Sequence, residues 1–245
     1  MAGYNYPHRP AIKKAESMSE STEQIIDERR LATAGLGEAL RRLNRASCET
    51  KVPDEVLDEV RAAAEQLTLL LDTNVRARNE VALVDDVAAN VRYFSPVRGL
   101  GSPASPPLVF TTQPDGGVVA TGSFDVRFEG PPAHVHGGII ALVFDEVLGQ
   151  PPIDADRWGM TASLSVNYHH PSPLHTELRF EAKITEQVGR KTIVSGWLTT
   201  AEDPETVLAS AEGLFIAPRQ EHYEARFGSL VTENGQAASV WRLIS

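Results

Sequence analysis

The chain has 245 residues, of which 42% are hydrophobic and 23% charged, proportions typical of globular domains. Its formal net charge of −10 argues against nucleic acid as the main partner. The single cysteine, Cys48, excludes a disulfide within the chain and favours a cytoplasmic location. No apolar run approaches the roughly 20 residues that a membrane helix requires, so we expect no membrane span.

The first part of the chain predicts helices. Good helix formers and apolar residues at helical spacing indicate two helices, over residues 20–44 and 53–71. Gly35 and Gly37 should weaken the middle of the first helix. We expect residues 18–80 to form an antiparallel helical pair that packs on the main domain or on a partner subunit. A separate binding module is the alternative.

Composition divides the rest of the chain. Residues before the helices have no apolar stretch, and a segment rich in proline and glycine follows the helices. We therefore expect a flexible tail at 1–17, a connector at 81–106, a main domain at 107–217 and a C-terminal extension at 218–245.

The main domain alternates with the period of a β-strand. Strands are expected over residues 118–128, 160–168, 178–184, 191–200 and 206–217. In the second of these, Leu164, Val166 and Tyr168 share one face, whereas Thr161 lies on the polar face. Short turns join the later strands, which predicts an antiparallel meander.

One helix interrupts the strands. The segment HVHGGIIALVFDEVLGQPP, residues 134–152, should begin its helix at Gly137-Gly138 and end it at Gly149 and the two prolines that follow. Its residues are apolar on every side, which predicts burial. The pattern therefore indicates an α+β fold in which a curved antiparallel sheet wraps around one central helix, the hotdog arrangement.

The segment EGPPAHVHGGIIALVFDEVLG resembles the signature of PaaI-like hotdog thioesterases, in which Asp145 follows His136 by nine residues. The likeness is greatest to thioesterase superfamily members four and five and their bacterial relatives, and it covers residues 90–217. The resemblance implies hydrolysis of acyl-CoA without a cofactor. It also implies a homodimer that can pair again into a dimer of dimers. Many family members carry Asn where this chain has Gly130, so water placement by that side chain is lost here.

Two adjacent carboxylates on an apolar helix require an explanation, because carboxylates are rarely buried without a partner. Neighbouring helical positions point about 100° apart, so one of the pair Asp145 and Glu146 should face a given pocket. We expect Asp145 to be a general base or, alternatively, a nucleophile. Glu146 is expected to pair with another group or to reach solvent. A purely structural carboxylate is the alternative for Asp145.

Gly137 and Gly138 lie at the helix start, where backbone N–H groups have no intrahelical partner and the helix dipole is positive. They could stabilise the oxyanion of a thioester, or they could simply allow a tight turn. The resemblance implies that His136 borders the thioester and that Thr161 orients the attacking water. An ordinary strand threonine is the alternative for Thr161.

Arg190 and Lys191 form a basic turn, and similar turns in the resembling family lie near the phosphates of CoA. A solvated turn is equally compatible with the sequence. Prolines interrupt the cluster of histidines between residues 169 and 175, so no metal site is expected.

The sequence therefore favours an acyl-CoA thioesterase acting on medium or long acyl chains. A non-catalytic acyl-CoA-binding or scaffold protein on the same fold is the alternative. A hydratase is disfavoured, because no histidine follows Asp145 on its helix.

Overall fold

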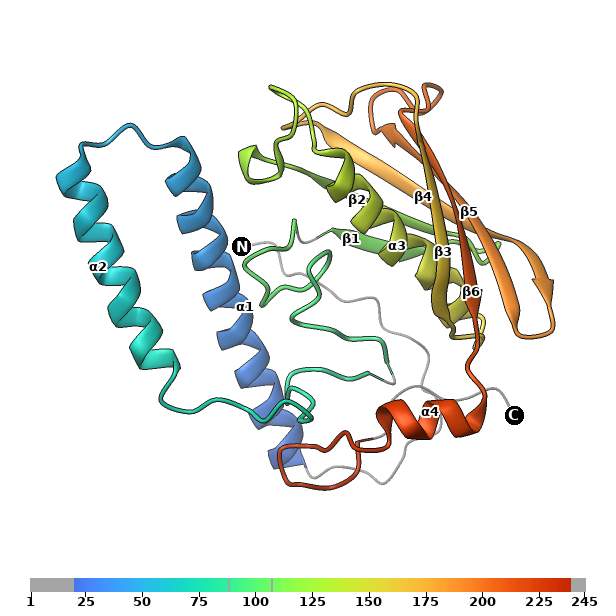
Figure 1. The fold of residues 1–245 in the computed structure, drawn as a ribbon, viewed down its shortest axis with the longest axis horizontal. Coiled ribbons are helices and arrows are strands. Elements are labelled where there is room, and N and C mark those ends of the chain that lie inside the picture. Colours follow the sequence, from blue (N-terminus) through green and yellow to red (C-terminus); the bar gives the residue numbers. More distant parts are fainter. Residues whose placement is uncertain (1–19, 88, 107, 239–245) are drawn as a thin grey trace.

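The structure is a computed structural model that describes residues 20–87, 89–106 and 108–238. Two helices, α1 (Glu20–Glu49) and α2 (Asp54–Leu71), precede a six-stranded sheet that carries α3 (Gly137–Asp154) (Figure 1). A short helix, α4 (Gln220–Phe227), follows the last strand. The expected tail, residues 1–17, lies outside the described residues. No helix in the described part of the chain has both the length and the apolarity to cross a membrane.

Helix α1 is held against the connector. The Arg41 guanidinium donates to the backbone carbonyls of Leu100 and Ser102, at 2.6 and 2.9 Å. A Cβ at Gly37 would lie 2.3 Å from the Leu100 carbonyl oxygen, so only glycine allows this close approach. The expectation that Gly35 and Gly37 weaken the helix is thus incomplete, because α1 continues through both and Gly37 makes its packing possible.

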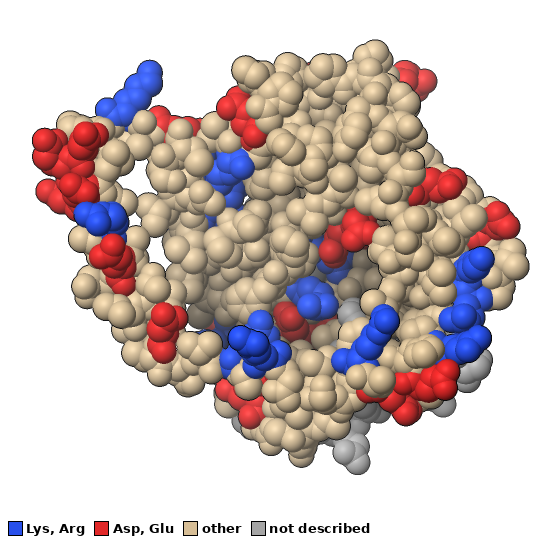
Figure 2. All heavy atoms as spheres, in the orientation of Figure 1, with Lys and Arg blue, Asp and Glu red and all other residues tan. Residues whose placement is uncertain are grey.

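Helix α2 differs from α1 in having no buried residue. It lies at one side of the molecule (Figure 1), and the space-filling view shows open gaps between it and the rest (Figure 2). Its leucines are strongly exposed, at 51% for Leu67 and 67% for Leu70. The described residues therefore provide α1, but not α2, with a packing surface.

The sheet contains six strands in the order β1-β2-β4-β5-β6-β3, and every neighbouring pair is antiparallel. The strands are β1 (Val109–Thr112), β2 (Val118–Ser123), β3 (Met160–Tyr168), β4 (Glu177–Val188), β5 (Lys191–Thr200) and β6 (Ala209–Ile216). The α+β class and the antiparallel sheet expected from the sequence are confirmed. Strand β1 was not predicted, because four largely exposed residues give too short an alternating pattern.

The strand expected over residues 118–128 ends early. After Ser123 the chain forms η1 (Val126–Phe128), a single 3-10 turn. The Asp125 carboxylate accepts from the Arg127 backbone N–H at 3.0 Å and from its guanidinium at 2.8 Å. Burial alone would raise the pKa of Asp125, but its hydrogen bonds with Arg127 outweigh that effect and hold the pKa below its usual value. This local pairing competes successfully with strand formation.

Helix α3 extends past its expected end at Gly149 and includes Pro151 and Pro152. Proline removes helical N–H donors, but both residues adopt helical geometry and their own carbonyls remain acceptors. The helix closes through bonds from Ala155 N–H to the Pro151 carbonyl, at 3.0 Å, and from Arg157 N–H to the Pro152 carbonyl, at 2.7 Å. The prolines therefore belong to the last turn of α3.

Helix α3 lies across one face of the sheet and contacts β2 through β6 (Figure 1). Its sheet-facing residues are fully or nearly fully buried: Ile140, Val143, Phe144, Val147 and Leu148. The rings of Phe144 and Phe180 meet edge to face, with centroids 5.3 Å apart. The expectation that α3 is buried on every side is wrong for a single chain, because Leu142 is 40% exposed and Gly138 is also exposed.

Candidate active site

The N-terminus of α3 is capped by His136. Its Nδ1 accepts from the Gly138 N–H at 2.9 Å, which requires the proton of a neutral ring to be on Nε2. The Gly137 N–H has no acceptor among the described residues. The two glycines and His136 thus lie together as expected, but one of the two predicted oxyanion donors is already occupied.

Gly130 packs directly beneath this cap. A Cβ there would lie 2.7 Å from the His136 Cα, so a larger residue would displace the histidine backbone. Backbone hydrogen bonds hold the loop on both sides, from Gly130 N–H to the His134 carbonyl and from His136 N–H to the Phe128 carbonyl. Glycine at position 130 therefore allows the loop to pack closely against His136.

Asp145 lies two turns further along α3, on the same open side as Gly138 and Leu142. It is partly exposed, and the Thr161 hydroxyl donates to its Oδ1 at 2.9 Å. The structure therefore brings together the predicted acid and the predicted threonine, which are separated by sixteen residues in the sequence.

Thr161 reaches Asp145 because of a β-bulge. Strict alternation predicts that Thr161 points away from the face of Leu164 and Val166, which pack against the core cluster that includes α3. The register of β3 against β6 shifts between Thr161 and Ser163. One extra residue reverses the alternation, so Thr161 and Leu164 both face the helix side of the sheet.

Glu146 points to a different environment from Asp145. Its carboxylate lies 3.3 Å from Nε of the buried Arg98, and the Ser95 hydroxyl donates to it at 3.4 Å. Arg98 also donates to the Gln150 side chain at 2.7 Å. The pairing role expected for Glu146 is therefore provided by the connector within the same chain.

Two residues near the site, Arg98 and Tyr168, were not predicted from the sequence. The Tyr168 hydroxyl donates to the Gly137 carbonyl at 2.7 Å, which brings the end of β3 to the start of α3. The strand pattern had already placed Tyr168 on the face of Leu164 and Val166, so its direction was predictable. Arg98 lies in an irregular segment, where no periodicity indicates which side chains point inward.

The basic turn lies two strands across the sheet from the start of β3. Arg190 donates to the Ala217 carbonyl at 2.6 Å, and both Arg190 and Lys191 are exposed. Lys191 begins β5 opposite Ile216, which in turn pairs with Met160 at the start of β3. Within the described ranges, no hydrogen bond or ion pair connects this turn with Asp145 or Thr161.

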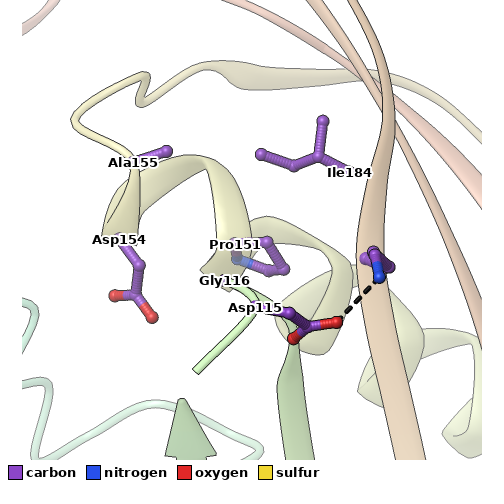
Figure 3. Close-up of a pocket in the computed structure, with 7 residues that line it drawn as sticks. Asp115, Gly116, Pro151, Asp154, Ala155 and Ile184 are labelled. Carbon is purple, nitrogen blue, oxygen red and sulfur yellow. Dashed lines mark hydrogen bonds and ion pairs between the residues drawn. The ribbon is translucent and has the colours of Figure 1, made fainter. Parts of the chain in front are cut away.

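A pocket of about 250 Å³ lies at the opposite end of α3 (Figure 3). It is lined by Asp115, Gly116, Pro151, Asp154, Ala155, Lys183 and Ile184. The ion pair between Asp115 and Lys183, at 2.7 Å, crosses one side, and the hydrogen bond from Lys183 lowers the pKa of Asp115. This pocket contains no predicted site residue. Among the described residues, no group of His, Cys, Asp or Glu could hold a metal ion.

Comparison with known proteins places the chain in a family. A crystal structure of a thioesterase superfamily protein is 32% identical and has a TM-score of 0.68, with coverage of 75% of this chain and 94% of that one. The mouse acyl-coenzyme A thioesterase THEM4 is 26% identical over 166 residues, covering 68% of each chain. The chain belongs to the thioesterase superfamily.

Further relatives match over regions of different length. An uncharacterized mitochondrial protein of Candida albicans is 26% identical over 181 residues, which cover 71% of this chain and 81% of that protein. The Xenopus laevis THEM4 is 34% identical, but the aligned region is 36% of this chain and 39% of that protein. No family model matches the chain.

Proposed function

We propose that this chain is an acyl-CoA thioesterase that hydrolyses medium- or long-chain acyl-CoA to the free acid and CoA. The hydrogen bond between Asp145 and Thr161, on the open face of α3, carries the proposal. The THEM4 relatives, which are named as acyl-coenzyme A thioesterases, support this substrate class. We also propose that the chain belongs to the branch of the superfamily that contains members four and five.

Asp145 acts as the general base in this mechanism. Its Oδ1 is held by Thr161, which leaves Oδ2 to accept a proton from water. The water oxygen attacks the thioester carbonyl carbon, the C–S bond breaks, and the CoA thiolate leaves and takes up a proton. In this arrangement Thr161 orients the water indirectly, by fixing the carboxylate that binds it.

Gly137 and Gly138 provide the oxyanion site at the positive end of α3. In the described part of the chain the Gly137 N–H has no acceptor, whereas the Gly138 N–H is bonded to His136. The thioester oxygen can therefore use Gly138 only when the imidazole rotates away. His136 borders the thioester in this mechanism. The substrate oxygen replaces its Nδ1 as the acceptor of the Gly138 N–H.

A single cysteine, Cys48, is typical of proteins in a reducing compartment, and we propose the cytoplasm on this basis. The Candida albicans relative is named as a mitochondrial protein.

A homodimer is proposed because the site is open in a single chain. Strand β3 forms one edge of the sheet and, among the residues that the structure describes, pairs only with β6. The unpaired backbone groups of an edge strand can pair with another chain. A second copy at this edge would cover the face that carries Asp145. Light scattering at micromolar concentration should give twice the mass of one chain, or four times if dimers pair again. A monomer mass would contradict the proposal.

Replacing Asp145 with Asn should remove most thioesterase activity without unfolding the protein. Asn has nearly the same size and can still accept from Thr161, but it cannot take a proton from water. Loss of a general base typically lowers the rate by about 10²–10⁴-fold. The measurement is kcat/KM for release of CoA, together with a thermal melting curve.

Glu146→Gln is the matched control, because it changes the adjacent carboxylate in the same way. Glu146 faces Arg98, so this variant should lose on the order of 1 kcal/mol of stability while its kcat/KM stays within a few-fold of wild type. Near wild-type activity in Asp145→Asn would refute the mechanism. An inactive Glu146→Gln protein would show that the other carboxylate is the base.

Arg190 and Lys191 are proposed to bind the phosphates of CoA. Replacing both with Ala should raise KM by roughly 3- to 10-fold and change kcat less, because phosphate contacts are similar in the ground and transition states. A double variant at the exposed Lys51 and Arg61 removes the same charge elsewhere and controls for the net charge. Equal KM values in the two double variants would assign the basic turn to the solvated surface.

A further inference from the structure

The peptide group between Gly137 and Gly138 is held at both ends. Its carbonyl oxygen accepts from the Tyr168 hydroxyl at 2.7 Å, and its N–H donates to Nδ1 of His136 at 2.9 Å. These are the oxygen and nitrogen of a single peptide plane. Two side chains therefore fix the peptide plane whose N–H is proposed to bind the oxyanion. Of these two, Tyr168 has no other role in the mechanism.

The Tyr168 ring also packs against the start of α3. It lies at the end of the edge strand β3, and its ring faces the Gly137 Cα, where an added Cβ would be 3.4 Å from the ring. The residue is 52% exposed, so its burial stabilises the fold only modestly. The hydroxyl is the part of the side chain that makes a specific contact.

A glycine pair needs such support. Glycine has access to far more backbone conformations than other residues. In addition, the N–H groups of the first helical turn have no intrahelical acceptor. A donor on the Gly137 carbonyl holds the orientation of the plane. It also polarises the peptide, because hydrogen bonds in a chain strengthen one another, and so makes the N–H of Gly138 a better donor.

We infer that Tyr168 is a positioning residue for thioester hydrolysis, which orients and polarises the Gly137–Gly138 peptide toward the developing oxyanion. The inference rests on the proposed function. When the thioester oxygen displaces His136 from the N–H, Tyr168 keeps the plane in place from its other side. The contribution grows as negative charge develops on the substrate oxygen, so it lowers the barrier more than it strengthens substrate binding.

Tyr168→Phe tests this role, because it removes one oxygen atom and leaves the ring on Gly137. We expect kcat to fall about tenfold, less than the 10²–10³-fold typical of losing an oxyanion donor itself, with KM within twofold of wild type. The amide proton signal of Gly138 in an NMR spectrum should also move upfield, because its peptide is less polarised. Tyr168 is half exposed and loses one hydrogen bond in this variant, so the melting temperature should fall only slightly.

Tyr223→Phe is the matched control. Tyr223 lies on α4 against Trp158 and Phe227, away from the start of α3, and the same atom is removed. Its kcat and KM should equal those of wild type. A Tyr168→Phe protein with wild-type kcat, or one in which only KM rises, would overturn this inference. If the wild-type chain were inactive, the proposed function itself would fail, whereas a fully active Asp145→Asn protein would refute only the role of Asp145 as the base.

Discussion

The packing of α3 against the sheet is the interaction on which the rest of the site depends. Phe144, Val147 and Leu148 have no exposed surface, and complete burial of a side chain of this size contributes roughly 1.5–3 kcal/mol. This packing fixes the rotation of the helix about its own axis. Once that rotation is set, every other side chain of α3 has a defined direction.

Three environments follow from this rotation. The apolar side faces the sheet, the side with Glu146 and Gln150 meets Arg98 of the connector, and the side with Gly138 and Asp145 stays open. Adjacent carboxylates thereby acquire different roles: one is neutralised by a buried guanidinium, and the other remains available for chemistry. The connector thus holds the face of α3 that neither the sheet nor the proposed substrate occupies.

The sequence predicted those parts of the site that periodicity controls. Alternation located β3 and β5, an apolar run ahead of β3 located α3, and the glycines marked where α3 begins. The bulge next to Thr161, the 3-10 turn at Asp125 and the pairing of Arg98 were not predictable in this way. Each depends on a local hydrogen bond or a tertiary contact that breaks or lacks a repeating pattern.

The most direct measurement is the release of CoA from acyl-CoAs of graded chain length. The free thiol is followed over time after the purified chain is added. A thioesterase built around Asp145 should turn over at least one medium- or long-chain acyl-CoA many times and produce free acid in equal amount. Tight binding of these acyl-CoAs without any release of thiol would contradict the proposal, and would instead make the chain an acyl-CoA-binding scaffold.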